Sequence, residues 1–327
     1  MSQKSKSRIG IGNIVSIFGL SLLGFFTFMG ALMLTAGNTG AAIAIAAASV
    51  VVMSLILAAA IYCKQVDTDF SRWKKLEIAA LVALVIAACF PARYVMHFFD
   101  VMGNKEELQA AAATDAGGIR SMFRTYEDGE LSALAVTNTG LQNALGEQCD
   151  LNVSDYLATA SINNYDDIDA WILVERRMLL GDMGVDGGLP YTAYKHNVDS
   201  VVNEWMADVK SWDLLKIGRQ SKLAGELAPA VASELTKRSA LGKLPVIFYD
   251  ETVYTVSNPN QTVTVNAPTL SFEQKLTHTQ EFNILYLLIY IIIIALIAVQ
   301  YFLTPRSEKT EIGEGQNISH IEGVNRL

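Results

Sequence analysis

Four long apolar segments constrain this chain more than any other feature of its sequence. They cover residues 14–36, 40–63, 76–102 and 282–303. A helix needs about 20 mostly apolar residues to cross the hydrocarbon core of a bilayer, and each segment reaches that length. The last segment contains no charged residue, whereas a helix of a soluble core would carry a polar stripe. The sequence therefore predicts a multi-pass integral membrane protein with four transmembrane helices.

Basic residues in the short connecting segments predict the orientation of these helices. Positively charged residues stay on the cytoplasmic side of a membrane. They occur before the first segment, between the second and third, and after the fourth: Lys4, Lys6, Arg8, Lys64, Arg72, Lys74, Lys75, Arg306 and Lys309. The connection between the first and second segments carries no charge. We therefore expect both termini, residues 1–13 and 304–327, in the cytoplasm, and residues 103–278 in the periplasm or extracellular space.

The predicted outer segment 103–278 is acidic, with 14 Lys and Arg against 24 Asp and Glu. This balance argues against a nucleic-acid partner and leaves two readings open, a cationic partner or simple solubility. Cys63 and Cys89 fall in predicted spans, so Cys149 is alone in the outer segment and no disulfide can form within it. Extracellular animal domains of this size more often carry disulfides, so we expect a bacterial inner membrane.

Most of the outer segment predicts helices that form a bundle with its own core. We expect a helix over 104–147, interrupted at Asp115–Gly118, and a second that begins near Asp166 as its N-cap. A third follows the apolar stripe from Val198 to Trp212 and ends near residues 217–220, and a fourth contains Pro229.

The pattern changes to alternating residues between Leu244 and Phe272, where Val, Thr and Tyr predominate. Ser257–Asn260 is a turn signal, so the sequence predicts a β-hairpin around it. The predicted fold class is thus a mostly α-helical integral membrane protein with four transmembrane helices, an extracytoplasmic helical-bundle domain and a small β-hairpin element at 244–272.

No usual catalytic or metal-binding motif occurs in the chain. The patterns HExxH, GxSxG, the P-loop and paired cysteines are all missing. Asp182 and Asp186 lie among glycines, as in part of a calcium loop, but the alternating ligands and the closing glutamate are not in place. The sequence favours a non-enzymatic protein with no cofactor and no metal site.

Three ionisable residues share one face of the third span. If the helix ended at Pro91, the apolar run before it would be too short to cross a bilayer, so we expect it to continue with a kink. Arg93, His97 and Asp100 then follow at helical spacing near the outer surface. Such a face suggests ion or proton passage, or alternatively an interfacial position among headgroups.

Other residues could contact a ligand, a partner or a neighbouring helix. The candidate contacts for a carboxylate or phosphate are Arg120, Arg124, Arg176 and Arg177, although local ion pairs explain them as well. Tryptophans could line a pocket or fill the core: Trp171, Trp205 and Trp212. Small residues in the second span allow close helix contact: Ala42, Ala44, Ala46 and Ala48.

Three functions fit these features. The first is a non-enzymatic envelope protein whose outer domain binds a protein partner, a further copy of the chain or a ligand within a membrane complex. The second is a channel or transporter subunit that uses the polar face of the third span. The third is a membrane sensor that lacks its own output domain.

Overall fold

The chain folds into two units, and 80% of the residues that the structure describes are helical. The computed structural model describes residues 10–66, 70–242, 244–278 and 283–306. One unit contains residues 1–105, 214–219 and 276–327, and the other contains residues 106–213 and 220–275. The expected cytoplasmic ends lie mostly outside the described residues, together with Lys4, Lys6, Arg8 and Lys309.

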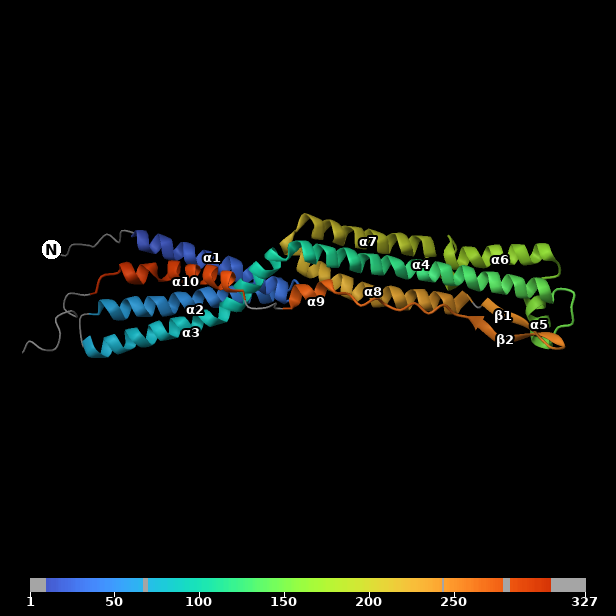
Figure 1. Ribbon diagram of the computed structural model, residues 1–327, viewed down its shortest axis with the longest axis horizontal. Coiled ribbons are helices and arrows are strands. Elements are labelled where there is room, and N and C mark those ends of the chain that lie inside the picture. The colour runs from blue at the N-terminus through green and yellow to red at the C-terminus, as the bar shows by residue number, and fades with distance from the viewer. Residues whose placement is uncertain (1–9, 67–69, 243, 279–282, 307–327) are drawn as a thin grey trace, which may run out of the picture. The chain divides into compact units, whose positions relative to one another are not determined.

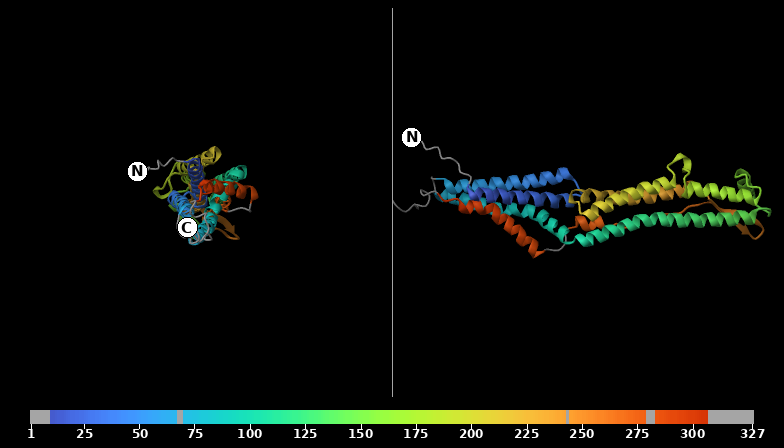
Figure 2. Two further views of the ribbon diagram at one scale, coloured as in Figure 1. Left: turned by 90° about the vertical axis from the view of Figure 1, so that its left-hand side faces the viewer. Right: turned by 90° about the horizontal axis from the view of Figure 1, so that it is seen from above.

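The first unit contains four helices that are long and apolar enough to cross a membrane. These helices lie side by side in Figures 1 and 2: α1 (Ile11–Leu34), α2 (Thr39–Gln65), α3 (Phe70–Gly103) and α10 (Ile284–Leu303). The four predicted apolar segments are therefore confirmed as helices. We call this unit the four-helix unit.

Small residues bring the helices of this unit close together. A Cβ atom on Gly30 of α1 would lie 1.9 Å from the carbonyl oxygen of Tyr94 in α3. One on Gly19 would lie 2.9 Å from the backbone nitrogen of Ile297 in α10. Such distances leave no room for a larger side chain, so glycine is required where these backbones cross. Ser16 of α1 also donates a 2.7 Å hydrogen bond to the carbonyl oxygen of Ile297.

Helix α3 runs through Pro91 without a break. Proline removes one backbone donor from a helix, which neighbouring groups must compensate when the helix lies in a bilayer. The hydroxyl of Tyr290 in α10 donates to the carbonyl oxygen of Ala88, one turn before the proline. This contact adds a hydrogen bond in the turn before the proline, next to the carbonyl of Ala87, which is the one that loses its helical donor at Pro91.

The second unit consists of helices and one small sheet, and we call it the acidic unit. Its elements are α4 (Lys105–Ala144), α5 (Leu151–Thr159), α6 (Tyr165–Leu180), the 3₁₀ turn η1 (Val185–Gly187), α7 (Tyr191–Ser211), α8 (Leu214–Gly242), β1 (Leu244–Asp250), β2 (Val253–Gln261) and α9 (Phe272–Thr277). Lys105 of α4, the first six residues of α8 and the last two of α9 fall in the four-helix unit. In Figure 1, α7 and α6 follow one another along α4, and α8 also runs along α4.

The expected interruption of α4 at Asp115–Gly118 is wrong. The helix is continuous, because glycines on one face allow the later chain to lie against it. A Cβ atom on Gly118 would lie 3.2 Å from Pro268, one on Gly129 2.6 Å from Val263, and one on Gly140 2.7 Å from the carbonyl oxygen of Ile247. These glycines recur every eleven residues, about three helical turns, and so share a face. Their cost in helix propensity is offset by packing.

A two-stranded antiparallel sheet follows α8, as the alternating pattern predicts. The position of its turn differs from the prediction. Asp250 pairs with Val253, so the turn is Glu251–Thr252, and the backbone of Ser257–Asn260 lies inside β2. Glu251 adopts a left-handed conformation with φ 52°, which a tight hairpin turn of this kind requires. The period-two sequence after Gln261 forms no strand.

Two helix boundaries in this unit also differ from the prediction. Asn164, not Asp166, is the N-cap of α6, and it forms a capping box with Asp167. Helix α7 ends at Ser211 rather than near residues 217–220, because Trp212 adopts a left-handed conformation with φ 59° and α8 begins at Leu214.

Candidate functional site

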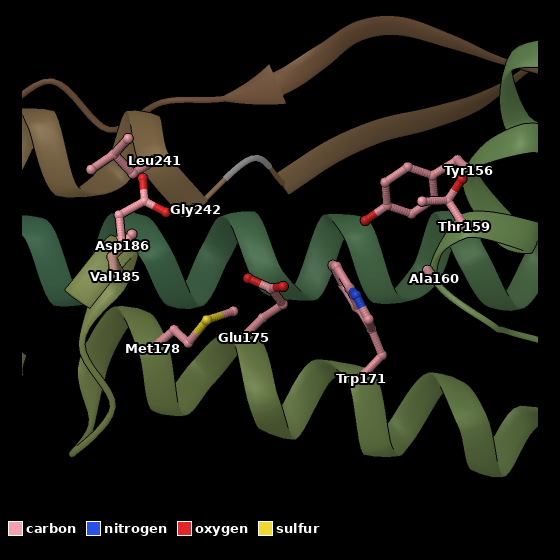
Figure 3. Close-up of a pocket in the computed structure, with 10 residues that line it drawn as sticks. All are labelled: Tyr156, Thr159, Ala160, Trp171, Glu175, Met178, Val185, Asp186, Leu241 and Gly242. Atoms are coloured by element: carbon pink, nitrogen blue, oxygen red, sulfur yellow. The ribbon is translucent and has the colours of Figure 1, made fainter.

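A pocket in the acidic unit is the candidate functional site. It has a volume of about 380 Å³, which is within the range of small-molecule sites. Helices α5, α6 and α8 and the turn η1 supply its walls (Figure 3). The lining residues are Tyr156, Thr159, Ala160, Trp171, Glu175, Met178, Val185, Asp186, Leu241 and Gly242.

Helix α6 contributes three residues that lie on one face at helical spacing: Trp171, Glu175 and Met178. In Figure 3 the Glu175 side chain extends from α6 between the other two, and its carboxylate lies among the lining residues. Glu175 is only 9% exposed, and its Oε2 atom has no hydrogen-bond partner among the described residues. Burial raises the pKa of Glu175 to about 7. A raised carboxyl pKa beside a pocket is one feature of functional sites, and it is the pocket that distinguishes Glu175 from the buried Glu130, whose pKa burial also raises.

Two aromatic rings meet beside this carboxylate. The rings of Tyr156 and Trp171 lie 6.1 Å apart with an interplanar angle of 80°, an edge-to-face arrangement. Burial, followed by the negative charge of Glu175, raises the pKa of Tyr156, so the phenol stays protonated. The site therefore combines aromatic surface with one acid.

The glycine-rich segment 181–190 forms another wall. Gly184 lies so close to Gly188 that a Cβ atom would be 2.1 Å from its carbonyl oxygen. The buried guanidinium of Arg238 donates a 2.6 Å hydrogen bond to the carbonyl oxygen of Leu189 and so fixes the end of this segment. Asp186 adopts a left-handed conformation and lines the pocket. Within the described residues, no group of three or more potential metal ligands occurs.

The ionisable residues of the third span occupy three different environments. Arg93 is exposed, His97 is 1% exposed, and Asp100 is half-buried and accepts a 3.0 Å hydrogen bond from the side chain of Asn104. The three residues follow one another on α3, but their side chains differ in exposure. The structure does not present them as one uniform polar surface.

The four candidate arginines do not meet at one site. Arg120 binds α7, with a 2.8 Å hydrogen bond to Asn203 and a 3.6 Å ion pair with Asp199. Arg177 makes two hydrogen bonds to Asp182, of 2.9 and 3.0 Å, at the surface. Arg124 and Arg176 are exposed. The contact of Arg177 with Asp182 is local, whereas Arg120 joins α4 to α7.

The candidate packing alanines of the second span divide into two pairs. Ala42 and Ala46 are buried against neighbouring helices, whereas Ala44 and Ala48 are exposed on the outer face of α2. Two residues advance a helix by about 200°, so alternate alanines cannot share one contact face. Close packing therefore involves Ala42 and Ala46 and does not involve Ala44 and Ala48.

Sequence reasoning did not single out Glu175 or Tyr156. One signal in the sequence could have indicated Glu175. The apolar stripe of α6 contains Ile168, Ile172 and Leu179, and Glu175 lies on the same face of the helix. Of the three candidate tryptophans, Trp171 lines the pocket and Trp205 is a core residue with 2% exposure. Trp212 ends α7.

Comparisons with protein-family models, with curated proteins and with solved structures gave no match for this chain. The functional argument therefore depends on the chemistry of the pocket and on the apolar helices.

Proposed function

We propose that this chain is a non-enzymatic, multi-pass envelope protein that binds a ligand in the pocket of its acidic unit. Helices α1, α2, α3 and α10 anchor it in a bacterial inner membrane, and residues 103–278 lie on the extracytoplasmic side. The observation that carries this proposal is the pocket itself, in which Glu175 is buried without a partner for Oε2. Keeping such a group unpaired destabilises the fold, which binding of a ligand would offset.

The pocket favours a small molecule over a protein partner as the first occupant. Its volume suits a small ligand, and its one buried acid provides an orienting contact. A channel or transporter has less support, because the ionisable residues of α3 range from exposed to buried. Membership of a larger membrane complex is compatible with this proposal and is a separate question.

A screen for ligands tests the binding proposal on the full-length protein in detergent. Compounds of cationic, neutral and anionic classes are scored by the rise in melting temperature that binding to the folded state produces. Thr159→Trp places a large ring at the exposed rim of the pocket, whereas Ala158→Trp adds the same ring at an exposed neighbour outside it. We expect ligands that Thr159→Trp eliminates and Ala158→Trp retains. If no compound shows that difference, the pocket is not a binding site.

Labelling of single cysteines tests the orientation. In a background with Cys63, Cys89 and Cys149 replaced by serine, one variant carries Asp169→Cys in α6 and another Arg72→Cys in α3; both positions are exposed. A membrane-impermeant maleimide added to intact spheroplasts should modify only the first variant. Modification of the second variant alone would reverse the proposed orientation.

A further inference from the structure

The charged groups that line the pocket are both acidic. Glu175 and Asp186 are the charged side chains among the ten lining residues, all of which belong to the described part of the chain. The nearest basic side chain on α8, Arg238, is not part of the lining and donates to Leu189. Among the described residues that line the pocket, an anionic ligand would therefore meet two acids and no cation, which disfavours it.

Apart from Thr159, the side chains of the remaining lining residues are aromatic or apolar. Tyr156 and Trp171 provide π surfaces, Met178 provides a polarisable thioether, and Val185 and Leu241 provide aliphatic contacts. Aromatic rings beside a carboxylate are the combination that recognises ammonium groups, because ring faces and carboxylates both attract positive charge. The apolar walls suit a hydrocarbon body attached to that group.

From this arrangement we infer that the pocket binds a small organic ammonium ion with an apolar body, held by Glu175 as its counter-ion and by the rings of Tyr156 and Trp171. The inference rests on the proposed function, since it names the class of ligand for the same pocket. An ammonium group supplies the hydrogen bond that Glu175 Oε2 lacks. Asp186 also lines the site and, because it is exposed, adds attraction for a cation without the cost of burial.

The acidity of the surrounding chain supports the same ligand class. Residues 103–278 carry ten more acidic than basic side chains, a balance that raises the local concentration of cations. The titratable groups that share the lining with Glu175 are Tyr156 from α5 and Asp186 from η1. Buried charged groups of α4 and α8, Glu130 and Arg238, lie outside the lining.

Three matched probes separate charge from shape: 2-phenylethylamine, 2-phenylethanol and phenylacetate. We expect calorimetric titration of the full-length protein in detergent, near pH 8, to give an affinity for the amine at least about tenfold above that for the alcohol, the scale of one charge-assisted hydrogen bond. The carboxylate should not bind. Thr159→Trp serves as the blank, because it corrects for uptake of the probes by the detergent micelle.

Two substitutions assign the charge recognition to one residue. Glu175→Gln keeps the shape and removes the charge, so the amine should lose about tenfold or more in affinity while the alcohol is unaffected. Asp169→Asn removes an exposed acid from the same helix, outside the pocket, and should change neither affinity.

The pH dependence of the unsubstituted protein provides a test that needs no variant. Since burial raises the pKa of Glu175 to about 7, the carboxylate must lose a proton before it can pair with the amine. The amine stays protonated below about pH 9, so its affinity should rise more than tenfold from about pH 5.5 to about pH 8 and then level off.

The outcomes distinguish the inference from the proposed function. Equal affinity for amine and alcohol, binding of the carboxylate, or an amine affinity that Glu175→Gln leaves unchanged would each overturn the ammonium assignment. The same holds if none of the three probes binds. In those cases a neutral or anionic compound whose binding Thr159→Trp eliminates would still support a ligand pocket. The proposed function fails only when no compound of any class shows that dependence.

Discussion

Glu77 in the four-helix unit and Glu175 in the acidic unit are both buried, but the fold treats their charges differently. Glu77 of α3 is 2% exposed and accepts hydrogen bonds of 2.7 and 3.0 Å from Arg306, and another from the hydroxyl of Tyr301. Glu175 of α6 is 9% exposed, and its Oε2 atom has no partner among the described residues. Burial is similar in the two cases, but pairing is not.

The comparison teaches that a buried acid is not in itself a functional signal. At Glu77 the positive charge of Arg306 offsets the cost of removing the carboxylate from water, so the group serves to join helices. Lys64 of α2 belongs to the same cluster. Its ammonium donates a 2.8 Å hydrogen bond to the carbonyl oxygen of Tyr301 and lies 4.5 Å from the centre of the Tyr301 ring. For Glu175 the described residues provide no such partner at Oε2, and the pocket beside it provides room for one.

Removal of Arg306 should give the largest effect. Arg306→Ala leaves the carboxylate of Glu77 buried without its cation, and breaking such a pair costs about 3–5 kcal/mol. The free energy of unfolding of the purified protein, measured by denaturant titration in detergent, should fall by that amount. The double variant Glu77→Gln, Arg306→Ala should recover much of the loss, because no uncompensated charge is left.

Arg72→Ala provides the control, since this exposed arginine precedes Glu77 on the same helix. It should leave the free energy of unfolding almost unchanged. A single Arg306→Ala variant as stable as this control would mean that Glu77 is not held by a buried pair, and the contrast with Glu175 would disappear.

Asp115 extends the comparison within the acidic unit, where it is 4% exposed and fully engaged. Its carboxylate accepts hydrogen bonds from the backbone nitrogens of Ser271, at 2.9 and 3.1 Å, and of Phe272, at 2.7 Å. It thus caps the start of α9 from α4. Asp115→Ala strands these donors, and we expect a loss of about 2–3 kcal/mol in the free energy of unfolding.

Hydrogen exchange localises that loss. The amides of Ser271 and Phe272 should exchange faster in Asp115→Ala, whereas Asp128→Ala, at an exposed position of α4, should leave them protected. Unchanged protection in Asp115→Ala would show that the cap contributes nothing to the stability of this segment.

The apolar helices could be predicted from sequence because one physical quantity decides them. A bilayer selects for length and hydrophobicity, which can be read directly, and α1 and α10 begin and end within three residues of the predicted segments. Their orientation follows from a separate rule, on basic residues, that the structure does not test. The small sheet was also predictable from its alternating residues.

The errors arose where distant contacts outweigh local preferences. Gly118 would weaken an isolated helix, but it leaves room for Pro268, and only the tertiary contact explains the continuous α4. In the sequence, nothing distinguishes Glu175 from other acidic residues of a helix; in the fold, α5 and η1 lie around it. Its role depends on residues distant in the chain, from Tyr156 of α5 to Gly242 of α8.

The pH dependence of stability provides the smallest of these effects and the sharpest test of the comparison. The pKa of Glu175 is about 7 in the folded protein, above the value of about 4.3 for an unfolded glutamate, so the folded state binds its proton more tightly. Its contribution to stability is therefore greatest below about pH 4.3 and is lost as the pH rises through 7. Between about pH 5 and about pH 8 this loss should reach about 2 kcal/mol.

Other groups titrate in the same range, so the relevant quantity is the difference in the free energy of unfolding between the unsubstituted protein and Glu175→Gln, each measured by denaturant titration at both pH values. We expect this difference to favour the variant progressively as the pH rises. If the two proteins respond identically to pH, Glu175 is paired after all, and the distinction from Glu77 on which the pocket argument depends is wrong.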